Sequence, residues 1–429
     1  MSLRRVSFAA LHVILLVAPW LMWNGNPLIR IDIPGRKVFL FGGIFTPYDT
    51  FFLVLLVLFL AFTLFFVTAL WGRIWCGYAC PQTVFLETWI RPIEVWIEGD
   101  RVLRKRRDAA GFSFDLVWRK LVKWSLFALV SAFLAMAMVS LFAGARSLWT
   151  GQAGGTAYFM VAVIAAAWFL DFTWFREQFC NYLCPYARFQ SALADDETLI
   201  VSYDEPRGEP REKGRNAAID GRCIDCNKCV VVCPQGIDIR DGFQLECIQC
   251  ARCIDACTSV MTPLNHRTLV AYGSIAEDEG RTVRRVRGRT VVYAALLASI
   301  LVSGAALMAT RVTFEASVNR APGSLFTVDP DGFVRNTYLL EITNKLQGDE
   351  NVSFEIRIDG LPGAELSTPG ISLGSSESTT TPLVVRVPSD VGLERTIPMS
   401  VHVSSAGREL VLHTTFKTDA QEGDVNASP

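Results

Sequence analysis

The chain has 429 residues, of which 51% are hydrophobic and 19% are charged, and its formal net charge at pH 7 is −1. This composition is more apolar than that of an ordinary water-soluble domain, and the near-zero charge excludes nucleic-acid binding through a broadly basic surface. The twelve cysteines lie in four tight groups between Cys76 and Cys257, which indicates metal ligation or redox chemistry rather than a secreted disulfide framework.

Five apolar stretches are long enough to cross a bilayer, which needs about 20 mostly apolar residues. The first contains His12 and Pro19. It could instead be a signal peptide, but no small-residue cleavage site follows Trp23, so we expect it to be retained. The predicted spans are approximately residues 6–23, 50–71, 124–145, 157–175 and 290–310.

Lysine and arginine predict the orientation of these spans, because they are enriched in cytoplasmic loops. Segment 72–120 carries nine of them, whereas the loop between the third and fourth spans has only Arg146. Five more precede the last span: Arg281, Arg284, Arg285, Arg287 and Arg289. The three in segment 24–49 favour the opposite orientation. On balance we expect segments 72–123 and 176–289 in the cytoplasm and the chain after residue 310 in the periplasm of a bacterial-type cell.

Two matched cysteine pairs follow the second and fourth spans. Their sequences are Trp75-Cys76-Gly77-Tyr78-Ala79-Cys80-Pro81 and Phe179-Cys180-Asn181-Tyr182-Leu183-Cys184-Pro185. Both read aromatic-Cys-x-Tyr-x-Cys-Pro, and Arg73 and Arg176 lie just upstream. The match predicts an internal repeat of spans one–two and three–four.

A helical backbone would place the two cysteines of each pair on one face, one turn apart. Two such thiolates could hold a soft metal ion such as Cu(I) or zinc, and the nearby arginines should lower the thiol pKa. A lone pair would more often be buried structural residues, but two matched copies favour a function. We expect a copper or dithiol site rather than a third iron–sulfur cluster, with these candidate catalytic and copper-binding residues: Cys76, Cys80, Cys180 and Cys184.

The most specific motif is Cys223-x-x-Cys226-x-x-Cys229-x-x-x-Cys233-Pro234, which repeats as Cys247-x-x-Cys250-x-x-Cys253-x-x-x-Cys257 with Thr258 in place of the proline. This spacing is typical of bacterial two-cluster ferredoxins, in which the fourth cysteine of each run ligates the other cluster. Zinc or disulfides would not explain the doubled pattern. One predicted 4Fe–4S cluster takes Cys223, Cys226, Cys229 and Cys257, and the second takes Cys247, Cys250, Cys253 and Cys233. The residues expected to shield them from water are Ile224, Ile237, Ile248 and Ile254.

After residue 310 the apolar residues alternate with polar ones, and turn-forming residues separate the short runs. This pattern predicts an antiparallel sandwich of about one immunoglobulin-like domain. His402 and His413 could bind a metal, but isolated strand histidines are usually ordinary surface residues. Residues 419–429 are expected to be frayed.

The sequence therefore predicts a multi-domain chain. Residues 1–175 form membrane helices one to four, with cytoplasmic loop 72–123. Residues 176–289 form a cytoplasmic segment that contains the second cysteine pair and a two-cluster ferredoxin-like domain at about 215–265. Residues 290–310 form a fifth transmembrane helix, and residues 311–429 form a periplasmic all-β immunoglobulin-like domain.

These motifs resemble the cytochrome c oxidase accessory protein family, which includes FixG, CcoG and RdxA. The matching stretches are residues 19–25, residues 71–83, the second cysteine pair and both ferredoxin runs. The resemblance extends over essentially the whole chain, including the family's C-terminal immunoglobulin-like domain. More distantly, the membrane and ferredoxin parts are similar to quinol-linked proteins of periplasmic nitrate and nitrous oxide reduction.

The resemblance implies a bacterial inner-membrane protein that assists assembly of a cbb-type oxidase by reducing Cu(II) to Cu(I). It implies two 4Fe–4S clusters as cofactors, with copper as a substrate or transient ligand. The implied partners are oxidase subunits, a copper chaperone or transporter, membrane lipid and an unidentified electron donor, and a homodimer is left open.

Two other functions stay open at this stage. The chain could be a quinol-linked electron carrier, for which His12 and Asp171 are the candidate quinone-site residues. It could also be a non-catalytic assembly scaffold with structural clusters. The sequence shows neither a Cys-x-x-Cys-His haem motif nor a dinucleotide fingerprint in its usual strand and helix context.

Overall fold

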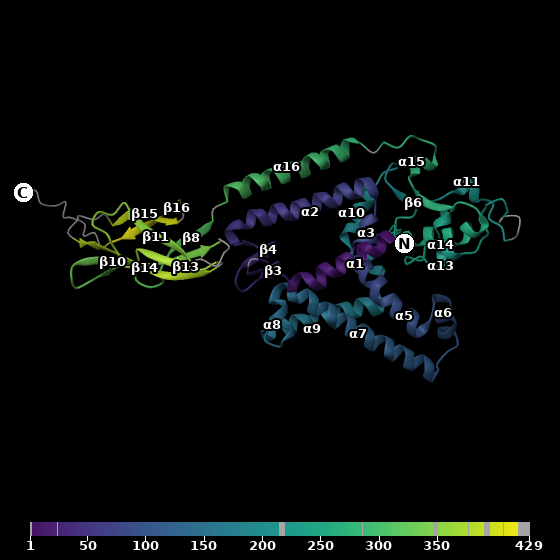
Figure 1. The fold of residues 1–429 in the computed structure, drawn as a ribbon, viewed down its shortest axis with the longest axis horizontal. Coiled ribbons are helices and arrows are strands. Elements are labelled where there is room, and N and C mark those ends of the chain that lie inside the picture. Colours follow the sequence, from purple (N-terminus) through teal and green to yellow (C-terminus); the bar gives the residue numbers. More distant parts are fainter. Residues whose placement is uncertain are drawn as a thin grey trace, which may run out of the picture. The chain divides into compact units, whose positions relative to one another are not determined.

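The computed structural model describes residues 2–23, 25–213, 219–284, 286–311, 313–345, 351–375, 377–389, 395–405 and 407–418. The chain forms two compact units, and their elements are labelled in Figure 1. The first unit comprises residues 1–21, 28–38 and 46–306, and the second comprises residues 22–27, 39–45 and 307–429. Arg285, one of the charges used above to predict orientation, lies outside the described residues.

Five helical stretches of the described chain are long and apolar enough to cross a membrane. They are Leu3–Trp20, Thr50–Trp71, Phe114–Ala143, Gly155–Phe175 and Gly288–Thr310. The helices are α1 (Ser2–Val17), α2 (Thr50–Trp71), α7 (Phe114–Ala143), α9 (Gly155–Leu170), which continues into the π-helical turn η4 (Asp171–Phe175), and α16 (Gly288–Thr310). Except at the start of α7, each stretch begins and ends within three residues of a predicted span.

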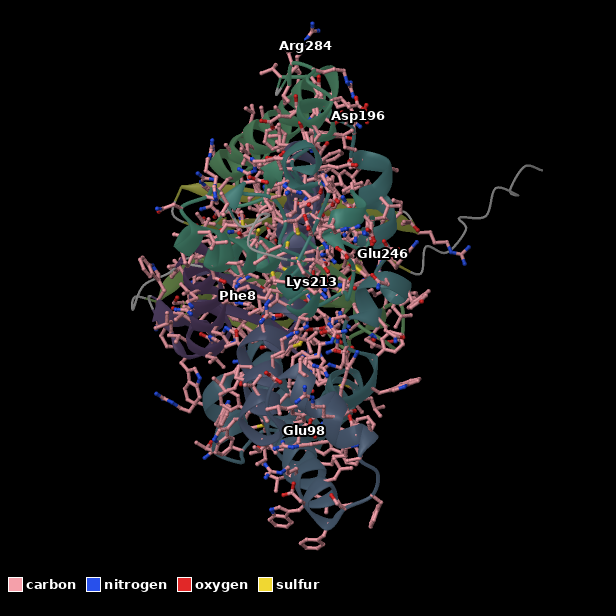
Figure 2. All side chains as sticks on the ribbon, turned by 90° about the vertical axis from the view of Figure 1, so that its right-hand side faces the viewer. Phe8, Glu98, Asp196, Lys213, Glu246 and Arg284 are labelled. Carbon is pink, nitrogen blue, oxygen red and sulfur yellow. The ribbon has the colours of Figure 1, made fainter. Side chains whose placement is uncertain are left out.

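The largest difference from the expected spans is at α7, which begins ten residues before the predicted residue 124. Ser113 caps this helix, because its hydroxyl accepts a hydrogen bond from the Leu116 amide at 3.2 Å. The added turns carry charged side chains, and Lys123 lies 2.8 Å from Glu98, which Figure 2 labels. An apolarity search misses such a polar start, although the cap makes it helical.

The chain between α2 and α7 is helical rather than an open loop. Its elements are α3 (Ile74–Tyr78), α4 (Pro81–Phe85), the π-helical turn η3 (Leu86–Ile90), α5 (Arg91–Glu98) and α6 (Arg101–Ala109). The buried cluster that joins them to α1, α7 and η4 contains Phe8, Val84, Phe85, Leu86, Ile90, Phe127, Leu134 and Phe172. The cysteine pair after α2 therefore sits on packed elements.

The cysteine-rich segment is closed by a small antiparallel sheet. Strand β6 (Ile200–Tyr203) pairs with β7 (Val270–Gly273), so Ile200 lies opposite Gly273 and Tyr203 opposite Val270. Between and beside these strands lie α10 (Pro185–Leu193), α11 (Glu205–Gly208), α13 (Lys228–Val231), η6 (Ile239–Asp241), α14 (Arg252–Met261), η7 (Thr262–Leu264) and α15 (Ile275–Asp278). The core under the sheet consists of Val201, Tyr203, Ile239, Met261, Leu269 and Val270.

The second unit contains an immunoglobulin-like sandwich of two antiparallel sheets. One sheet has the order β12–β14–β10–β8, with β9 also paired to β10, and the other has the order β13–β11–β15–β16. Their bounds are β8 (Phe314–Arg320), β9 (Thr327–Val328), β10 (Phe333–Asn344), β11 (Val352–Asp359), β12 (Glu365–Leu366), β13 (Gly370–Leu373), β14 (Ser378–Pro388), β15 (Thr396–Ser405) and β16 (Arg408–Lys417). The prediction of an all-β tail is confirmed.

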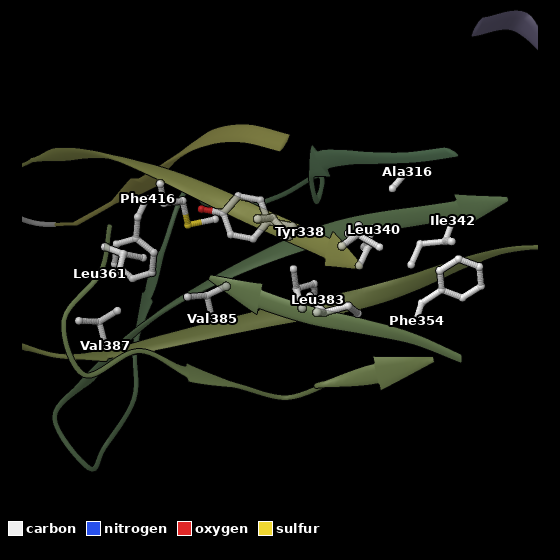
Figure 3. Packing of buried hydrophobic residues seen from close by; sticks show 14 of the residues in the cluster. Ala316, Tyr338, Leu340, Ile342, Phe354, Leu361, Leu383, Val385, Val387 and Phe416 are labelled. Carbon is white, nitrogen blue, oxygen red and sulfur yellow. The ribbon is translucent and has the colours of Figure 1, made fainter. Parts of the chain in front are cut away.

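Both sheets contribute to one core, shown in Figure 3. Along β10 every second side chain is buried, as the alternating pattern predicts, and Tyr338 in its middle donates a hydrogen bond to the Thr415 carbonyl at 2.7 Å. His402 lies 2.9 Å from Glu409, and His413 lies 3.1 Å from the Ser400 hydroxyl. The expected fraying of residues 419–429 falls outside the described residues.

Candidate metal centres

The two ferredoxin runs fold into loops with the same backbone pattern. In the first run Asp225 and Asn227 have positive φ angles of 51° and 55°, and in the second Gln249 and Ala251, at the equivalent places, have 54° and 60°. Such angles are uncommon for residues other than glycine, and they concentrate at functional sites. In each run these positive φ angles alternate with ordinary ones and turn the backbone tightly. The first three cysteines of the run therefore surround a common cavity.

Two cavities of similar size lie inside these loops. The first is lined by Cys223, Cys226, Cys229 and Cys257. The second is lined by Cys233, Cys247, Cys250 and Cys253, and also by Cys229, which lines both cavities. The first set is the one that the spacing predicts, and the second contains the predicted set. The remaining lining is largely apolar and includes Ile224 in the first cavity and Ile237 and Ile248 in the second. Four thiols in apolar surroundings suit a 4Fe–4S cluster, and ligation itself stays a prediction.

Burial dominates the electrostatics of Cys229 and Cys247, one thiol from each run. It raises the pKa of Cys229 and of Cys247 to about 11, so both are neutral at pH 7 until a metal displaces the proton. Arg240 opposes the shift at Cys229. This guanidinium lies 2.9 Å from Asp225 and 2.6 Å from Asp238, beside the first cavity. It therefore places a fixed positive charge next to the first cluster site.

The missing proline after Cys257 has a local effect only. In the second run α14 continues past the cysteine to Met261, and the Thr258 hydroxyl donates a hydrogen bond to the Ile254 carbonyl at 2.8 Å. In the first run α13 ends at Val231, before Cys233 and Pro234. Cys257 still lines the first cavity, and its sulfur accepts a hydrogen bond from the Leu269 amide at 3.4 Å.

The membrane-edge cysteine pairs do not lie on continuous α-helices, so the predicted i,i+4 helical geometry is wrong. Cys80 (φ −64°, ψ 125°) and Cys184 (φ −71°, ψ 113°) are extended. Each precedes a proline, which disfavours the helical conformation in the residue before it. The Cys80 amide donates to the Trp75 carbonyl at 2.8 Å, and the Cys184 amide donates to the Phe179 carbonyl at 2.9 Å. The two motifs thus share one local fold.

Hydrogen bonds tie each motif to the other half of the repeat. Gln82, after the first pair, donates to Asp171 at 2.6 Å and to the Arg176 carbonyl at 3.1 Å, just before the second pair. Conversely, the Ala187 carbonyl, after the second pair, accepts a hydrogen bond at 2.7 Å from Arg73, before the first. These reciprocal bonds hold the two cysteine pairs next to each other.

Cys76, Cys80, Cys180 and Cys184 form one group, which we term the thiol quartet. The thiols interact electrostatically across the repeat, since Cys180 and Cys184 raise the pKa of Cys76 and Cys80 raises that of Cys180. Burial is the largest cause, and it brings the pKa of Cys180 to about 12. Arg73 lowers the pKa of both thiols but does not outweigh burial. The expectation that arginines make these thiols acidic is therefore wrong.

The thiol quartet lies against the second ferredoxin run. A Cβ atom on Gly77 would come within 2.8 Å of the Ile248 and Gln249 carbonyl oxygens and within 2.9 Å of the Cys250 Cα. The same guanidinium, that of Arg73, lowers the pKa of Cys76 and of Cys247. Gly77 thus allows the membrane-edge motif and the second cavity to approach as closely as two backbones can.

Among the described residues, no group of three or more His, Cys, Asp or Glu side chains is placed to hold a single metal ion. This holds for the ferredoxin runs as well as for the thiol quartet. The four thiolates of a 4Fe–4S cluster each bind a different iron atom, so they need not converge on one point. Copper ligation by the quartet stays a prediction.

Three family models match the chain. A model described as a 4Fe-4S dicluster domain matches residues 175–275, and one described as a 4Fe-4S binding domain matches residues 53–107 and 153–196. A third, described as the immunoglobulin-like fold at the C-terminus of FixG, matches residues 304–418.

The curated relatives include RdxA of Cereibacter sphaeroides, which is 38% identical over 376 residues, 83% of this chain and 79% of the relative. The nitrogen fixation protein FixG of Rhizobium meliloti is 33% identical over 412 residues, 85% of this chain and 78% of that protein. The chain belongs to the FixG/RdxA family. Together with the 4Fe–4S domains, this makes it an iron–sulfur electron-transfer protein.

The FixG/RdxA family also has a similar solved structure. The crystal structure of a FixG-related protein from Vibrio parahaemolyticus is 20% identical with a TM-score of 0.24, and it covers 25% of this chain and 99% of that one.

Several residues that shape these sites were not singled out from the sequence. Gly77 is the clearest, and its signal was one of the differences inside the matched motifs, where Asn181 stands in its place. Asn181 instead donates a hydrogen bond to Gln235, on the rim of the second cavity, at 3.1 Å. Gln249 and Arg240 gave no local signal, because their roles depend on segments far apart in the chain.

Proposed function

We propose that this chain is a membrane-bound iron–sulfur protein that delivers electrons to Cu(II), supplying Cu(I) for the copper centre of a cbb-type cytochrome c oxidase. The observation that carries the proposal is the close approach of Gly77 to the backbone of residues 248–250. It sets a group of four thiols, of which Cys76 is buried and the other three are half-buried, against a cavity that suits a 4Fe–4S cluster.

The redox balance is simple. Each Cu(II) takes up one electron to become Cu(I), so a cytoplasmic one-electron donor of low potential has to supply one electron per copper ion. The bound clusters supply the one-electron chemistry. The residues of the chain hold the clusters, exclude water with Ile237 and Ile248, and bring the thiol quartet close to the second cluster site at the proposed membrane edge, where Cu(II) would be reduced.

The proposal includes an orientation in a bacterial inner membrane. Five candidate spans and the arginines and lysines that flank them favour clusters in the cytoplasm and the immunoglobulin-like domain in the periplasm. The oxidase subunits and a copper chaperone or transporter would then receive Cu(I) from the membrane. The partners and a homodimeric state are part of the proposal.

The experiment is copper reduction by full-length protein purified in detergent without oxygen. Protein reduced with dithionite and freed of excess reductant should form Cu(I), measured with a Cu(I)-specific chelator, as the cluster absorbance reoxidises. Cys76→Ser combined with Cys180→Ser should abolish this reaction while the ferredoxin runs keep their visible absorbance. Tyr182→Phe, an exposed change between Cys180 and Cys184, is the matched control. Equal copper reduction by the double variant and the control would refute the proposal.

The alternative functions are less well supported by the geometry. His12 receives a hydrogen bond from Trp89 at 2.8 Å and bonds the Phe8 carbonyl, and Asp171 accepts a hydrogen bond from Gln82. Both candidate quinone-site residues thus hold structural elements together. A scaffold with structural clusters would not reoxidise on addition of Cu(II), so the same experiment separates it from the proposal.

A further inference from the structure

We infer that the thiol quartet is a third 4Fe–4S site, with two ligands from each half of the membrane repeat. A cubane needs four ligands, and neither cysteine pair alone can supply them. The two pairs meet, because Gln82 donates a hydrogen bond to Asp171 and Arg73 donates one to the Ala187 carbonyl, and each bond ties one half of the repeat to the other. Together they provide a complete set of four thiolates.

The preference for a copper or dithiol site depended in part on a helical backbone that the structure does not contain. Cys80 and Cys184 are instead extended and followed by proline. The same Cys-Pro step ends the first ferredoxin run at Cys233 and Pro234, where the cysteine lines the second cavity. Each membrane-edge pair thus ends in the way that a cluster-binding run ends.

A buried positive charge lies beside the two pairs. The guanidinium of Arg73, which is only 5% exposed, donates a hydrogen bond across the repeat to the Ala187 carbonyl. That charge can offset part of the negative charge of four thiolates. In addition, the model described as a 4Fe-4S binding domain matches both segments that carry the pairs, which suits one cluster shared between them.

A cluster bound by the quartet would lie close to the second ferredoxin cavity, because the backbone at Gly77 contacts the backbone of residues 248–250. The electron path would then continue from the cytoplasmic runs to the membrane edge. The inference rests on the proposed function for the destination of the electrons, while the identity of the bound metal can be measured independently. Direct copper ligation by the quartet is the competing occupant.

The test is metal analysis of the full-length protein, purified without oxygen, with electron paramagnetic resonance of the reduced state. The variants are Cys80→Ala, Cys184→Ala and the two combined, because alanine offers no ligand atom. The wild type should contain about twelve irons and twelve sulfides per chain, and each variant about eight, since a cubane holds four of each. All three variants should lack the same resonance signal. Tyr182→Phe should keep the full content.

The pattern of losses carries the test. Equal losses of about one third in both single variants and in the double variant would support one shared cluster. About eight irons in the wild type, unchanged in the variants, would overturn the inference, whether copper or no metal accompanies them. Losses that add between the two single variants would also overturn it, because each pair would then hold its own metal. A full iron content in a protein that cannot reduce Cu(II) would refute the proposed copper reduction alone.

Discussion

Gly72 and Arg176 adopt nearly the same backbone conformation, at φ +60°, ψ −129° and φ +50°, ψ −123°, although only one of them is a glycine. Each ends a long apolar helix and stands four residues before the first cysteine of its pair. This equivalence makes Glu177 the counterpart of Arg73, so the two upstream arginines do not have matching roles. Arg176 is held in its strained conformation by two hydrogen bonds to Glu94, at 2.8 and 3.0 Å.

Glu94→Gln should destabilise the first unit. Glu94 is only 3% exposed and also pairs with Arg104 at 2.7 Å, and breaking a buried ion pair costs about 3–5 kcal/mol. Thermal unfolding of the detergent-solubilised protein measures the loss. Glu279→Gln, an exposed change, is the control and should shift the midpoint little. An unchanged midpoint for Glu94→Gln would show that the carboxylate does not support Arg176.

The same carboxylate should make stability depend on pH. Burial alone would raise the pKa of Glu94, but Arg176, with Arg104 and Lys123, outweighs burial and holds the pKa below its ordinary value. A lowered folded-state pKa stabilises the protein above the unfolded-state value of about 4.3, and this stabilisation is lost as the pH falls through the folded value. The fall in unfolding midpoint below about pH 4 should therefore be steeper in wild type than in Glu94→Gln.

Gly77→Ala should separate the membrane-edge motif from the second ferredoxin run. The added Cβ would lie 2.8 to 2.9 Å from backbone atoms of residues 248–250. Backbone atoms cannot rotate away as the end of a flexible side chain would. We expect slower reoxidation by Cu(II) after rapid mixing, with unchanged iron content. Gly155→Ala, where a Cβ meets nothing within 4 Å, is the control. Equal rates in the two variants would mean that this contact is not on the electron path.

The exchange of fourth ligands between the ferredoxin runs can be tested by pairwise substitution. Cys226→Ala with Cys257→Ala should lose about four irons, because both cysteines line the first cavity and serve one cluster. Cys250→Ala with Cys257→Ala should lose about eight, because those two serve different clusters. Iron and sulfide analysis distinguishes the two. The reverse order of losses would mean that each run ligates its own cluster.

Arg240→Gln should lower the reduction potential of one cluster only. The variant loses a positive charge beside the first cavity and leaves the Asp225 and Asp238 carboxylates uncompensated. A shift of tens of millivolts is expected, since about 59 mV corresponds to a tenfold change in a one-electron equilibrium. Arg281→Gln is the matched control, because Arg281 also pairs with two carboxylates but on an exposed surface. A redox titration followed by electron paramagnetic resonance measures the cluster potentials in both variants. Equal shifts in Arg240→Gln and Arg281→Gln would contradict the placement of Arg240 beside the first cluster.

The proposed orientation can be tested with reporter fusions. Fusions after Asp108 and Asp241 should report a cytoplasmic location, and a fusion after Gly363 should report the periplasm, because five spans separate the two ends. A cytoplasmic signal at Gly363 would mean that one of the five helices does not cross. The first helix is the one to test next, with a fusion after Gly35.

Local patterns in the sequence predicted most of the fold. Continuous apolar runs gave the five long helices, and alternation along residues 352–358 gave β11, in which Phe354 and Ile356 are buried between exposed residues. The sets of cysteines that share a cavity also followed from spacing, because short loops leave few ways to surround a common point. Where the expected span missed the first turns of α7, a polar helix start with a serine cap had replaced the apolar signal.

The sequence was less informative where segments distant in the chain meet. The conformation of Cys80 and Cys184 depends on a proline rule that the simple helical spacing ignored. The joining of the two pairs depends on Gln82 and Arg73, each of which binds a partner about 90 or more residues away. The direction of the thiol pKa shifts depends on burial, and a neighbouring arginine in the sequence gives no measure of burial.

The pairing of β6 with β7 has a consequence for how the cysteine-rich segment could be exchanged in evolution. The two strands bring the start and the finish of the cysteine-rich segment side by side, at Ile200 and Gly273. The helices before and after it therefore place few demands on its length, and segments joined at neighbouring points are readily inserted or exchanged. Such a segment could be replaced by another cluster-bearing cassette, as long as the turn at residues 248–250 still fitted against Gly77.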